Sequence, residues 1–231
     1  MHSADTRFLL AAKMLGQVNT LADIGTDHAF LPIYLIDNNI AQHVIACDIA
    51  QGPLATAEQN IKKAGAENKI SLRLADGLKG VKPGECNAVT VMGMGGETIS
   101  QIIDSAPWLK AERQVLVLQP MTCDDRLRKY LNLNGFEIIE EKAVFSKGRV
   151  YTVIKTKWND CKENTAPEFE YIGKLLEDNP SDAEKAFVLR RLKSMQKCLK
   201  NIEHITYKKE LYEKLKIAIP NVEKIYNLYF E

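Results

Sequence analysis

The sequence predicts an α/β fold, in which a mostly parallel sheet with a terminal antiparallel hairpin is followed by a small α-helical coiled-coil domain. Up to Gly135, short apolar runs alternate with longer helical stretches, as is typical of parallel strands joined by crossover helices. Two β-prone segments around a turn come next. Apolar residues near the C-terminus then recur at spacings of four and three, as in a coiled coil. We therefore expect one domain over residues 1–158 and another over residues 159–231.

The first expected elements are helices and short strands in alternation. Residues 4–15 have an amphipathic helical pattern that Gly16 can end. The helix after the second strand is bounded by Pro53, in a first-turn position, and by Gly65. The expected parallel strands are rich in Val and Ile and lie at residues 21–24, 44–47, 70–74, 88–92 and 115–118.

The expected hairpin pairs residues 136–145 with residues 150–157 through a turn at residues 146–149. Residues 159–166 are polar and lack periodicity, which indicates a linker. The hairpin is expected to add antiparallel strands at one edge of the parallel sheet.

The C-terminal segment predicts a helical hairpin or a short antiparallel coiled coil. Ser181 and Glu184 have the spacing of a capping box, which marks a helix start. A returning helix is expected to end before Pro220, because proline disrupts a helix interior. The apolar seam consists of Val188, Leu192, Met195, Leu199 and Ile202, with Leu211 and Leu215 on the returning helix.

The composition limits the classes of protein. The chain has 231 residues, of which 45% are hydrophobic, so it can bury a core. A formal net charge of +1 gives no overall signal for a polyanionic partner. No leader-like or membrane-spanning run is visible, so we expect a cytoplasmic protein without a membrane partner. The scattered cysteines predict reduced structural thiols and no metal site; they are Cys47, Cys86, Cys123, Cys161 and Cys198.

The loop after the first strand predicts the type of cofactor. Ligands of open α/β sheets bind at the carboxyl ends of the strands, and Gly25 permits a tight turn there. Gly25 is the one glycine present of the three in a dinucleotide-binding fingerprint, and Asp27 would place a negative charge beside a pyrophosphate. A nicotinamide cofactor is therefore disfavoured. An acidic loop suits S-adenosylmethionine, whose amino and sulfonium groups are positive.

Two further aspartates follow the next strands. Asp48 lies 23 positions after Gly25, near the offset at which an acidic side chain takes ribose hydroxyls. Asp76, next to the flexible Gly77, can accept a hydrogen bond from the amine of adenine. One aspartate alone suits a helix cap or a loop, but three in order at strand ends favour a cofactor site. His28 suits a structural role and a ligand contact equally.

These segments resemble the motifs of the bacterial tRNA (adenine-22-N1)-methyltransferases, which are class I enzymes with a Rossmann-like domain and a C-terminal coiled coil. The resemblance covers nearly the whole chain, and residues 25–29 combined with residues 93–96 are its specific part. One departure is Met121, which follows Gln119-Pro120 where the family often has Asn. The matching segments are residues 23–32, 46–49, 75–78 and 92–97.

The resemblance implies that a group of strand-end residues surrounds S-adenosylmethionine and that the Gly93–Gly96 loop lies beside the methyl group. The expected cofactor-binding residues are Asp23, Gly25, Asp27, His28, Asp48, Ile49, Asp76, Gly77, Met92 and Gly93.

The Gly-Met-Gly-Gly loop indicates which atom is methylated. Enzymes that methylate exocyclic amines commonly hold the amine with side-chain acceptors at this position, whereas small residues let a flat base approach closely. A ring nitrogen is therefore favoured, and its lone pair needs alignment more than a base. Because N1 lies on the Watson-Crick edge, the adenine must be unpaired or flipped out. Phe30 or Tyr34 can stack on it, although core packing suits both; the catalytic candidates are Asp27, Gly93, Met94 and Gly95.

The expected coiled coil carries a local excess of positive charge. Residues 182–216 contain ten Lys or Arg against five Asp or Glu. Arg190, Lys193, Lys197 and Lys200 recur at spacings of three and four, so they form one stripe of a helix. Such a stripe suits the phosphates of tRNA, and the alternative is the solvated face of a coiled coil.

Other functions remain possible on the sequence alone. One is a methyltransferase of another RNA, a small molecule or a protein, with the coiled coil used for dimerisation. Another is a scaffold that retains the fold without catalysis. We expect a tRNA-binding monomer, with a dimer as the alternative.

Overall fold

The computed structural model describes residues 5–110, 114–160, 162, 165–176 and 179–230. Its centre is one seven-stranded sheet with the strand order β3-β2-β1-β4-β5-β7-β6. The first five strands are parallel, and β6 and β7 form an antiparallel hairpin beside β5. This confirms the predicted fold class. The strands are β1 (Val18–Ile24), β2 (Ala41–Asp48), β3 (Ile70–Leu74), β4 (Ala88–Gly95), β5 (Val115–Thr122), β6 (Phe136–Ser146) and β7 (Arg149–Trp158).

The end of β4 and the turn of the β6–β7 hairpin differ from what the sequence predicts. β4 continues to Gly95, with shifts of its register against β5 between Met92 and Gly95, so the expected loop is an irregular strand end. Such irregularities redirect a strand beside a functional site. The hairpin turn contains two residues, Lys147 and Gly148, with φ of 48° and 73°. Positive φ at both central residues matches the twist of the flanking strands, so the turn is shorter than predicted.

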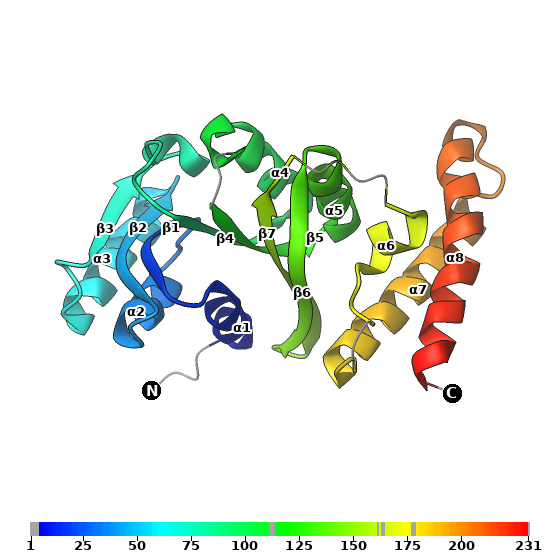
Figure 1. The fold of residues 1–231 in the computed structure, drawn as a ribbon, viewed down its shortest axis with the longest axis horizontal. Coiled ribbons are helices and arrows are strands. Elements are labelled where there is room, and N and C mark those ends of the chain that lie inside the picture. The colour runs from blue at the N-terminus through cyan, green and yellow to red at the C-terminus, as the bar shows by residue number, and fades with distance from the viewer. Residues whose placement is uncertain (1–4, 111–113, 161, 163–164, 177–178, 231) are drawn as a thin grey trace.

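Helices cover both faces of the sheet (Figure 1). Buried residues of α1, α2 and α3 pack on one face, and those of α4 and α5 pack on the other. Gly65 ends α3 in a left-handed conformation, as predicted. The helices are α1 (Thr6–Leu15), α2 (Phe30–Asp37), α3 (Gln51–Ala64), α4 (Gly96–Asp104) and α5 (Asp124–Leu133), with short 3-10 turns η1 (Gly77–Gly80) and η2 (Pro107–Lys110).

The cysteines that the structure describes are unpaired, as predicted. Cys47 and Cys86 are buried, and burial raises the pKa of each thiol to about 11. Both are therefore structural thiols. Cys123 and Cys198 are partly exposed, and Cys161 lies outside the described residues.

The C-terminal helices form a third apolar cluster together with the tip of the hairpin. Ser181 and Glu184 make both hydrogen bonds of the predicted capping box at the start of α7 (Asp182–Ile202). Most of the predicted seam is buried, but Leu199 is only partly buried and Leu211, on the returning helix, is 37% exposed. A short helix that the sequence did not indicate, α6 (Pro167–Ile172), packs against the same cluster, and η3 (Thr206–Lys208) precedes α8. Figure 1 shows α7 and α8 side by side.

The prediction that the returning helix ends before Pro220 is wrong, because α8 (Lys209–Phe230) runs through it. A proline inside a helix costs about 3 kcal/mol. Leu215, Ile219 and Val222 are buried around it, and burying each such side chain stabilises by about 1.5–3 kcal/mol. The apolar contacts therefore outweigh the interruption. No helix in the described ranges has the length and apolar character that crossing a membrane requires.

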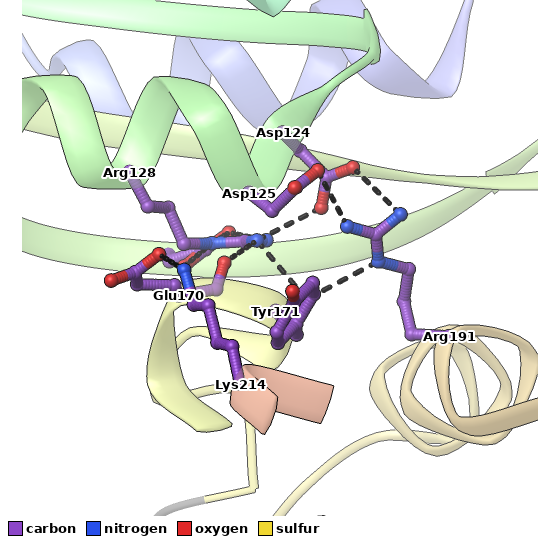
Figure 2. A network of polar contacts seen from close by, with 8 residues as sticks. Asp124, Asp125, Arg128, Glu170, Tyr171, Arg191 and Lys214 are labelled. Carbon is purple, nitrogen blue, oxygen red and sulfur yellow. Dashed lines mark hydrogen bonds and ion pairs between the residues drawn. The ribbon is translucent and has the colours of Figure 1, made fainter. Parts of the chain in front are cut away.

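A buried ion cluster connects the C-terminal helical segment, which comprises α6, α7 and α8, to the sheet (Figure 2). Arg128 of α5 has a 1% exposed side chain and donates to Asp124 and Glu141, and to the carbonyl oxygens of Glu170 and Tyr171. Burial disfavours the charge of Arg128, but the two carboxylates outweigh burial and raise its pKa. Arg128 therefore holds α5, β6 and α6 together.

A second arginine extends this ion cluster to α7. Arg191 donates to Asp125 at 2.8 Å and lies 3.6 Å from Asp124. Figure 2 shows Arg191 reaching from α7 toward the two aspartates at the start of α5. The position of α7 relative to the sheet is therefore fixed by charge as well as by apolar packing.

Replacing Arg128 tests how far the fold depends on this cluster. Arg128→Met leaves the buried Glu141 without its cation and Asp124 with Arg191 alone, so we expect the free energy of unfolding to fall by about 3–5 kcal/mol. Urea denaturation measures this loss. The control is Arg126→Met, which breaks an exposed pair with Glu97 and should cost at most about 1 kcal/mol. Equal losses in the two variants would contradict the role of Arg128.

Candidate active site

An open cleft of about 450 Å³ lies at the carboxyl ends of the parallel strands. It brings together six of the residues that the sequence predicts for the cofactor or the chemistry. They come from four separate strand ends, β1 to β4, as the fold class requires. These residues are Gly25, Asp48, Ile49, Asp76, Gly77 and Met94.

The sequence did not predict the helical wall of the cleft. It is one face of α4 with Thr98, Gln101 and Ile102, continued by Ser105, the residue that caps the helix. The four positions are successively three, one and three residues apart, so each has a neighbour three or four residues away on the same helix face. That spacing could have identified them once α4 was known to follow the loop.

Gly25 allows the floor of the cleft to form. Its φ is 75°, and a Cβ atom at this position would lie 2.2 Å from the terminal methyl carbon of Met94. The backbone amides of Gly25 and Thr26 both donate to the carbonyl oxygen of Cys47, at 2.9 and 3.0 Å. A larger residue than glycine would therefore strain the backbone and displace Met94.

Asp48 joins the loops that surround the cleft. Its carboxylate accepts from the amide of Asp27 at 3.2 Å and from that of Ala50 at 2.9 Å. Its own carbonyl oxygen accepts from the amide of Ala75 at 2.9 Å. The carboxylate is half-buried, so it combines a fixed position with access to a ligand in the cleft.

Asp76 faces the same cleft from η1. Its carboxylate pairs with the ammonium of Lys79 at 2.6 Å, and both side chains are more than half exposed. An exposed pair of this kind contributes at most about 1 kcal/mol, so a ligand can compete for the carboxylate at low cost. Gly77 has a φ of 58°, and a Cβ there would lie 3.3 Å from Ile102. The glycine therefore leaves room beside Asp76 that a side chain would take up against Ile102.

Several predicted residues lie beside the cleft rather than on its surface. Asp27 is exposed and 3.6 Å from the imidazole of His28. In the described structure the buried Nδ1 of His28 has no hydrogen-bond partner. The His28 ring meets the Phe30 ring edge-on at 5.7 Å. Phe30 is 53% exposed, whereas Tyr34 packs against the core, which leaves Phe30 as the candidate for stacking on a base.

The small-residue segment at the end of β4 has both structural and functional constraints. A Cβ on Gly96 would lie 2.2 Å from the carbonyl oxygen of Cys123, so α4 and α5 can begin side by side only with glycine here. Around Gly93, by contrast, no described atom lies within 4 Å of a Cβ position. Gly93 is exposed, and its neighbour Met92 is buried. The end of β4 therefore has open space around Gly93, while the neighbouring Met92 is packed in the core.

The predicted basic stripe lies on the exposed side of α7, away from the apolar seam. Arg190, Lys193, Lys197 and Lys200 are all exposed. Arg190 lies over the ring of Phe187 at 5.2 Å, and its pKa is lowered by partial burial, against the opposing charge of Asp124. Arg190 is therefore the end of the stripe that lies close to α5.

A groove of about 500 Å³ runs beside the stripe, between α5, α7 and the start of α8. The sequence did not indicate it, because its residues come from distant segments. It contains several cations and two aromatic side chains among acidic neighbours. The positive and aromatic residues are Arg126, Lys129, Arg191, Lys208, Lys214, Tyr171 and Tyr207.

Within the described residues, no three His, Cys, Asp or Glu side chains are grouped so that they could hold a metal ion.

Asp23 lies under the cleft and accepts a hydrogen bond of 2.6 Å from the hydroxyl of Thr90 on the neighbouring strand. Burial raises the pKa of this carboxyl above its usual 3.8, although the hydrogen bond from Thr90 opposes the shift. The folded chain thus holds the proton more tightly than the unfolded chain. This contribution to stability is present below pH 3.8 and is lost as the pH rises through the folded pKa.

The variant Asp23→Asn tests this assignment. Asparagine keeps the acceptor for Thr90 but cannot ionise, so the stability of wild type relative to Asp23→Asn should decline as the pH rises from about 4. The measurement is the free energy of unfolding of both proteins in urea over a pH series. A difference that stays constant or grows with pH would show that Asp23 is not held with a raised pKa.

Comparison with known proteins identifies the family. Residues 4–154 match the family described as "Methyltransferase domain". The curated tRNA (adenine(22)-N(1))-methyltransferase of Bacillus subtilis (strain 168) is 33% identical over 154 residues, which span 67% of this chain and 65% of that relative. The match thus spans slightly less than two thirds of the curated relative.

Solved structures agree with this match over nearly the whole chain. The B. subtilis m1A22 tRNA methyltransferase TrmK gives a TM-score of 0.85 at 25% identity, over 98% of this chain and 100% of that chain. TrmK of M. capricolum, solved in complex with S-adenosyl-homocysteine, gives 0.78 at 26% identity, over 96% and 97%. With a matching sequence over residues 4–154 and a matching sheet, the chain belongs to the methyltransferase domain family.

Proposed function

We propose that this chain transfers a methyl group from S-adenosylmethionine to N1 of adenine 22 in tRNA. The observation that carries the proposal is the cleft, which Asp48 and Asp76 line at two strand ends, beside the exposed Asp27 and the small residues at the end of β4. The similarity to proteins named as tRNA (adenine-22-N1)-methyltransferases supports the substrate. We place the activity in the cytoplasm, where tRNA is modified.

The cleft suits S-adenosylmethionine in charge and shape. Asp48 would take the ribose hydroxyls, because its carboxylate is fixed by two backbone amides and still borders the cleft. Asp76 would accept from the adenine amine after release from Lys79. Ile49 is 70% exposed at the cleft and offers an apolar contact for the ring. Gly25 leaves room along the backbone, and the acidic residues suit a cationic cofactor but oppose a pyrophosphate.

His28 gives an independent sign of a ligand near the cleft. A buried polar atom without a partner is costly, and the Nδ1 atom of His28 is such an atom within the described structure. Asn60 donates to the backbone carbonyl oxygen of His28 at 3.0 Å, which helps to hold the main chain of this residue in place. We infer that this nitrogen finds its partner when the site is filled.

The residues around the end of β4 would align the adenine. When bound, S-adenosylmethionine supplies a methyl group on a positive sulfonium. The ring nitrogen already carries a lone pair, so the chain has to orient the base rather than deprotonate it. The open space at Gly93 admits a flat ring, and the exposed Phe30 can stack on it. The exposed carboxylate of Asp27 would stabilise the positive charge of the methylated base.

The helical segment would bind the rest of the tRNA. The stripe and the neighbouring groove offer cations along α7, starting at Arg190 near α5. Phosphate contacts need exposed cations at helical spacing rather than a particular sequence. In this proposal residues 1–158 perform the chemistry and residues 159–231 orient the substrate.

The main alternative uses the C-terminal helices for dimerisation. The apolar seam of α7 is occupied within one chain, because it packs against α6, α8 and the tip of the hairpin. A dimer through that seam would have to displace these contacts. The structure therefore favours RNA binding by a monomer.

Methyl transfer to defined transcripts tests the proposed substrate. The purified chain, incubated with methyl-labelled S-adenosylmethionine, should label an unmodified tRNA transcript that has adenine at position 22. A transcript with guanine at position 22, refolded in the same way, should stay unlabelled because N1 of guanine carries a hydrogen and has no free lone pair. Equal labelling of both transcripts would refute the assignment of the nucleotide.

Charge reversal tests the stripe. Changing Arg190, Lys193 and Lys197 to Glu should weaken tRNA binding at least about tenfold and reduce the salt dependence by roughly 0.7–0.9 per lost phosphate contact. The affinity for S-adenosylmethionine should not change. Filter binding over a series of salt concentrations measures both effects.

A matched variant controls for the change in net charge. Lys62, Lys63 and Lys69 are exposed and lie near the end of α3 and the start of β3, away from the carboxyl ends of the strands. Changing these three to Glu should leave tRNA affinity nearly unchanged. A similar loss in both triple variants would mean that total charge, and not the stripe, governs binding.

A further inference from the structure

The amide of Gln119 connects the N-terminal helix to the end of β4. Gln119 lies on β5 and its side chain is fully buried. Its Oε1 accepts from the backbone amide of Gly93 at 3.2 Å and from Nη1 of Arg7 at 3.1 Å. Its Nε2 donates to the carbonyl oxygen of Pro120 at 2.7 Å. A side chain from α1 thus reaches the segment beside the cleft.

The partners of Gln119 leave its amide one orientation. Arg7 and the amide of Gly93 can only donate, so they require the oxygen of Gln119. The carbonyl oxygen of Pro120 can only accept, so it requires the nitrogen. A reversed amide would place donor against donor twice in a buried position, which is costly. Arg7 therefore reinforces the orientation in which Gln119 offers its oxygen to the amide of Gly93.

Arg7 is itself held in place from several sides. Asp5 accepts from Nε of Arg7 at 3.0 Å and from Nη2 at 2.7 Å, and Ser146 donates to Asp5 at 2.9 Å. The hydrogen bonds from Arg7 lower the pKa of Asp5 to about 2, so Asp5 stays ionised at neutral pH. The guanidinium lies 5.1 Å from the ring centre of Tyr151. The hairpin therefore supports the same arginine.

Met121 completes this arrangement. Its sulfur lies 3.3 Å from Nη1 of Arg7 and 3.7 Å from Nε2 of Gln119, so it serves as a weak acceptor. The sequence left open whether this position keeps a polar role without Asn. The thioether supplies one to the same two side chains.

Gly93 depends on this contact more than its neighbours do. It has a φ of 77°, and no described atom lies within 4 Å of where its Cβ would be. Side-chain packing therefore does not hold it, and the hydrogen bond to Gln119 does. The same open space is where the proposed function places the target base.

We propose that Arg7 acts through Gln119 as a positioning residue, which fixes Gly93 for methyl transfer and makes α1 part of the active site. This inference rests on the proposed function for its effect on turnover. The relay of Asp5, Arg7, Gln119 and Gly93 can be tested without turnover as well.

Amide exchange at Gly93 is the direct test. The full chain contains 13 glycines, so labelling with 15N-glycine gives a simple spectrum in which each amide can be followed. Arg7→Met keeps the apolar stem and removes every donor, and the exchange of the Gly93 amide should rise at least about threefold. Arg7→Lys should raise the exchange rate of the Gly93 amide less, because one ammonium group replaces only part of the hydrogen bonds that the planar guanidinium donates. The amide of Gly65, which ends α3, serves as an internal reference.

Kinetics separate positioning from stability. Arg7→Met should lower kcat for tRNA methylation about tenfold, while the Kd for S-adenosylmethionine stays within about twofold. Lys13, exposed on the same helix, provides the control Lys13→Met, which should change neither value. Arg7→Lys should recover part of the lost kcat.

The outcomes distinguish this inference from the proposed function. Unchanged exchange at Gly93 in Arg7→Met would overturn the relay, and so would an equal rise at Gly65, because the effect would then be general unfolding. If Arg7→Met showed faster exchange at Gly93 but a normal kcat, the proposed effect of Arg7 on methyl transfer would be overturned. Faster exchange at Gly93 in Arg7→Met, together with a wild-type chain that methylates no tRNA, would refute the proposed function and leave the relay standing.

Discussion

The buried guanidinium of Arg128 is the interaction on which the arrangement of this molecule depends. It lies between two carboxylates and two backbone carbonyl oxygens, so it ties α5, β6 and α6 into one unit. Gly173 shows how tight the site is, because a Cβ there would lie 2.0 Å from Glu141. Burying a charge is favourable only when its geometry is fully satisfied, and such a cluster fixes one arrangement against others. The helical segment is therefore attached to the sheet at a defined position.

This attachment begins where the chemistry is proposed to occur. Asp124, the first residue of α5, contacts both Arg128 and Arg191, and the residue before it packs against Gly96 at the start of α4. The same few residues thus border the small-residue segment and anchor α7. A tRNA held on α7 would meet the cleft at a fixed distance. In the proposed function, the start of α5 is therefore the element through which α7 would hold a tRNA in position at the cleft.

The sequence predicted the features that depend on local pattern. The strand ends placed Gly25, Asp48 and Asp76 around one cleft because parallel strands share a carboxyl edge. It missed what depends on contacts between distant segments, namely the Arg128 cluster, the α4 wall of the cleft and the bond between Arg7 and Gln119. The helix through Pro220 was missed for the same reason, since tertiary burial outweighs local propensity. The cofactor and RNA roles of the predicted residues stay predictions.

The central claim is that a cleft of acidic strand ends and small residues directs a methyl group to a ring nitrogen of adenine. The most direct measurement is mass spectrometry of nucleosides from tRNA methylated by the purified chain, digested at neutral pH so that N1-methyladenosine does not rearrange. We expect N1-methyladenosine in the fragment that contains position 22. N6-methyladenosine as the primary product would contradict it, because the segment from Gly93 to Gly96 carries no side-chain acceptor for an amine.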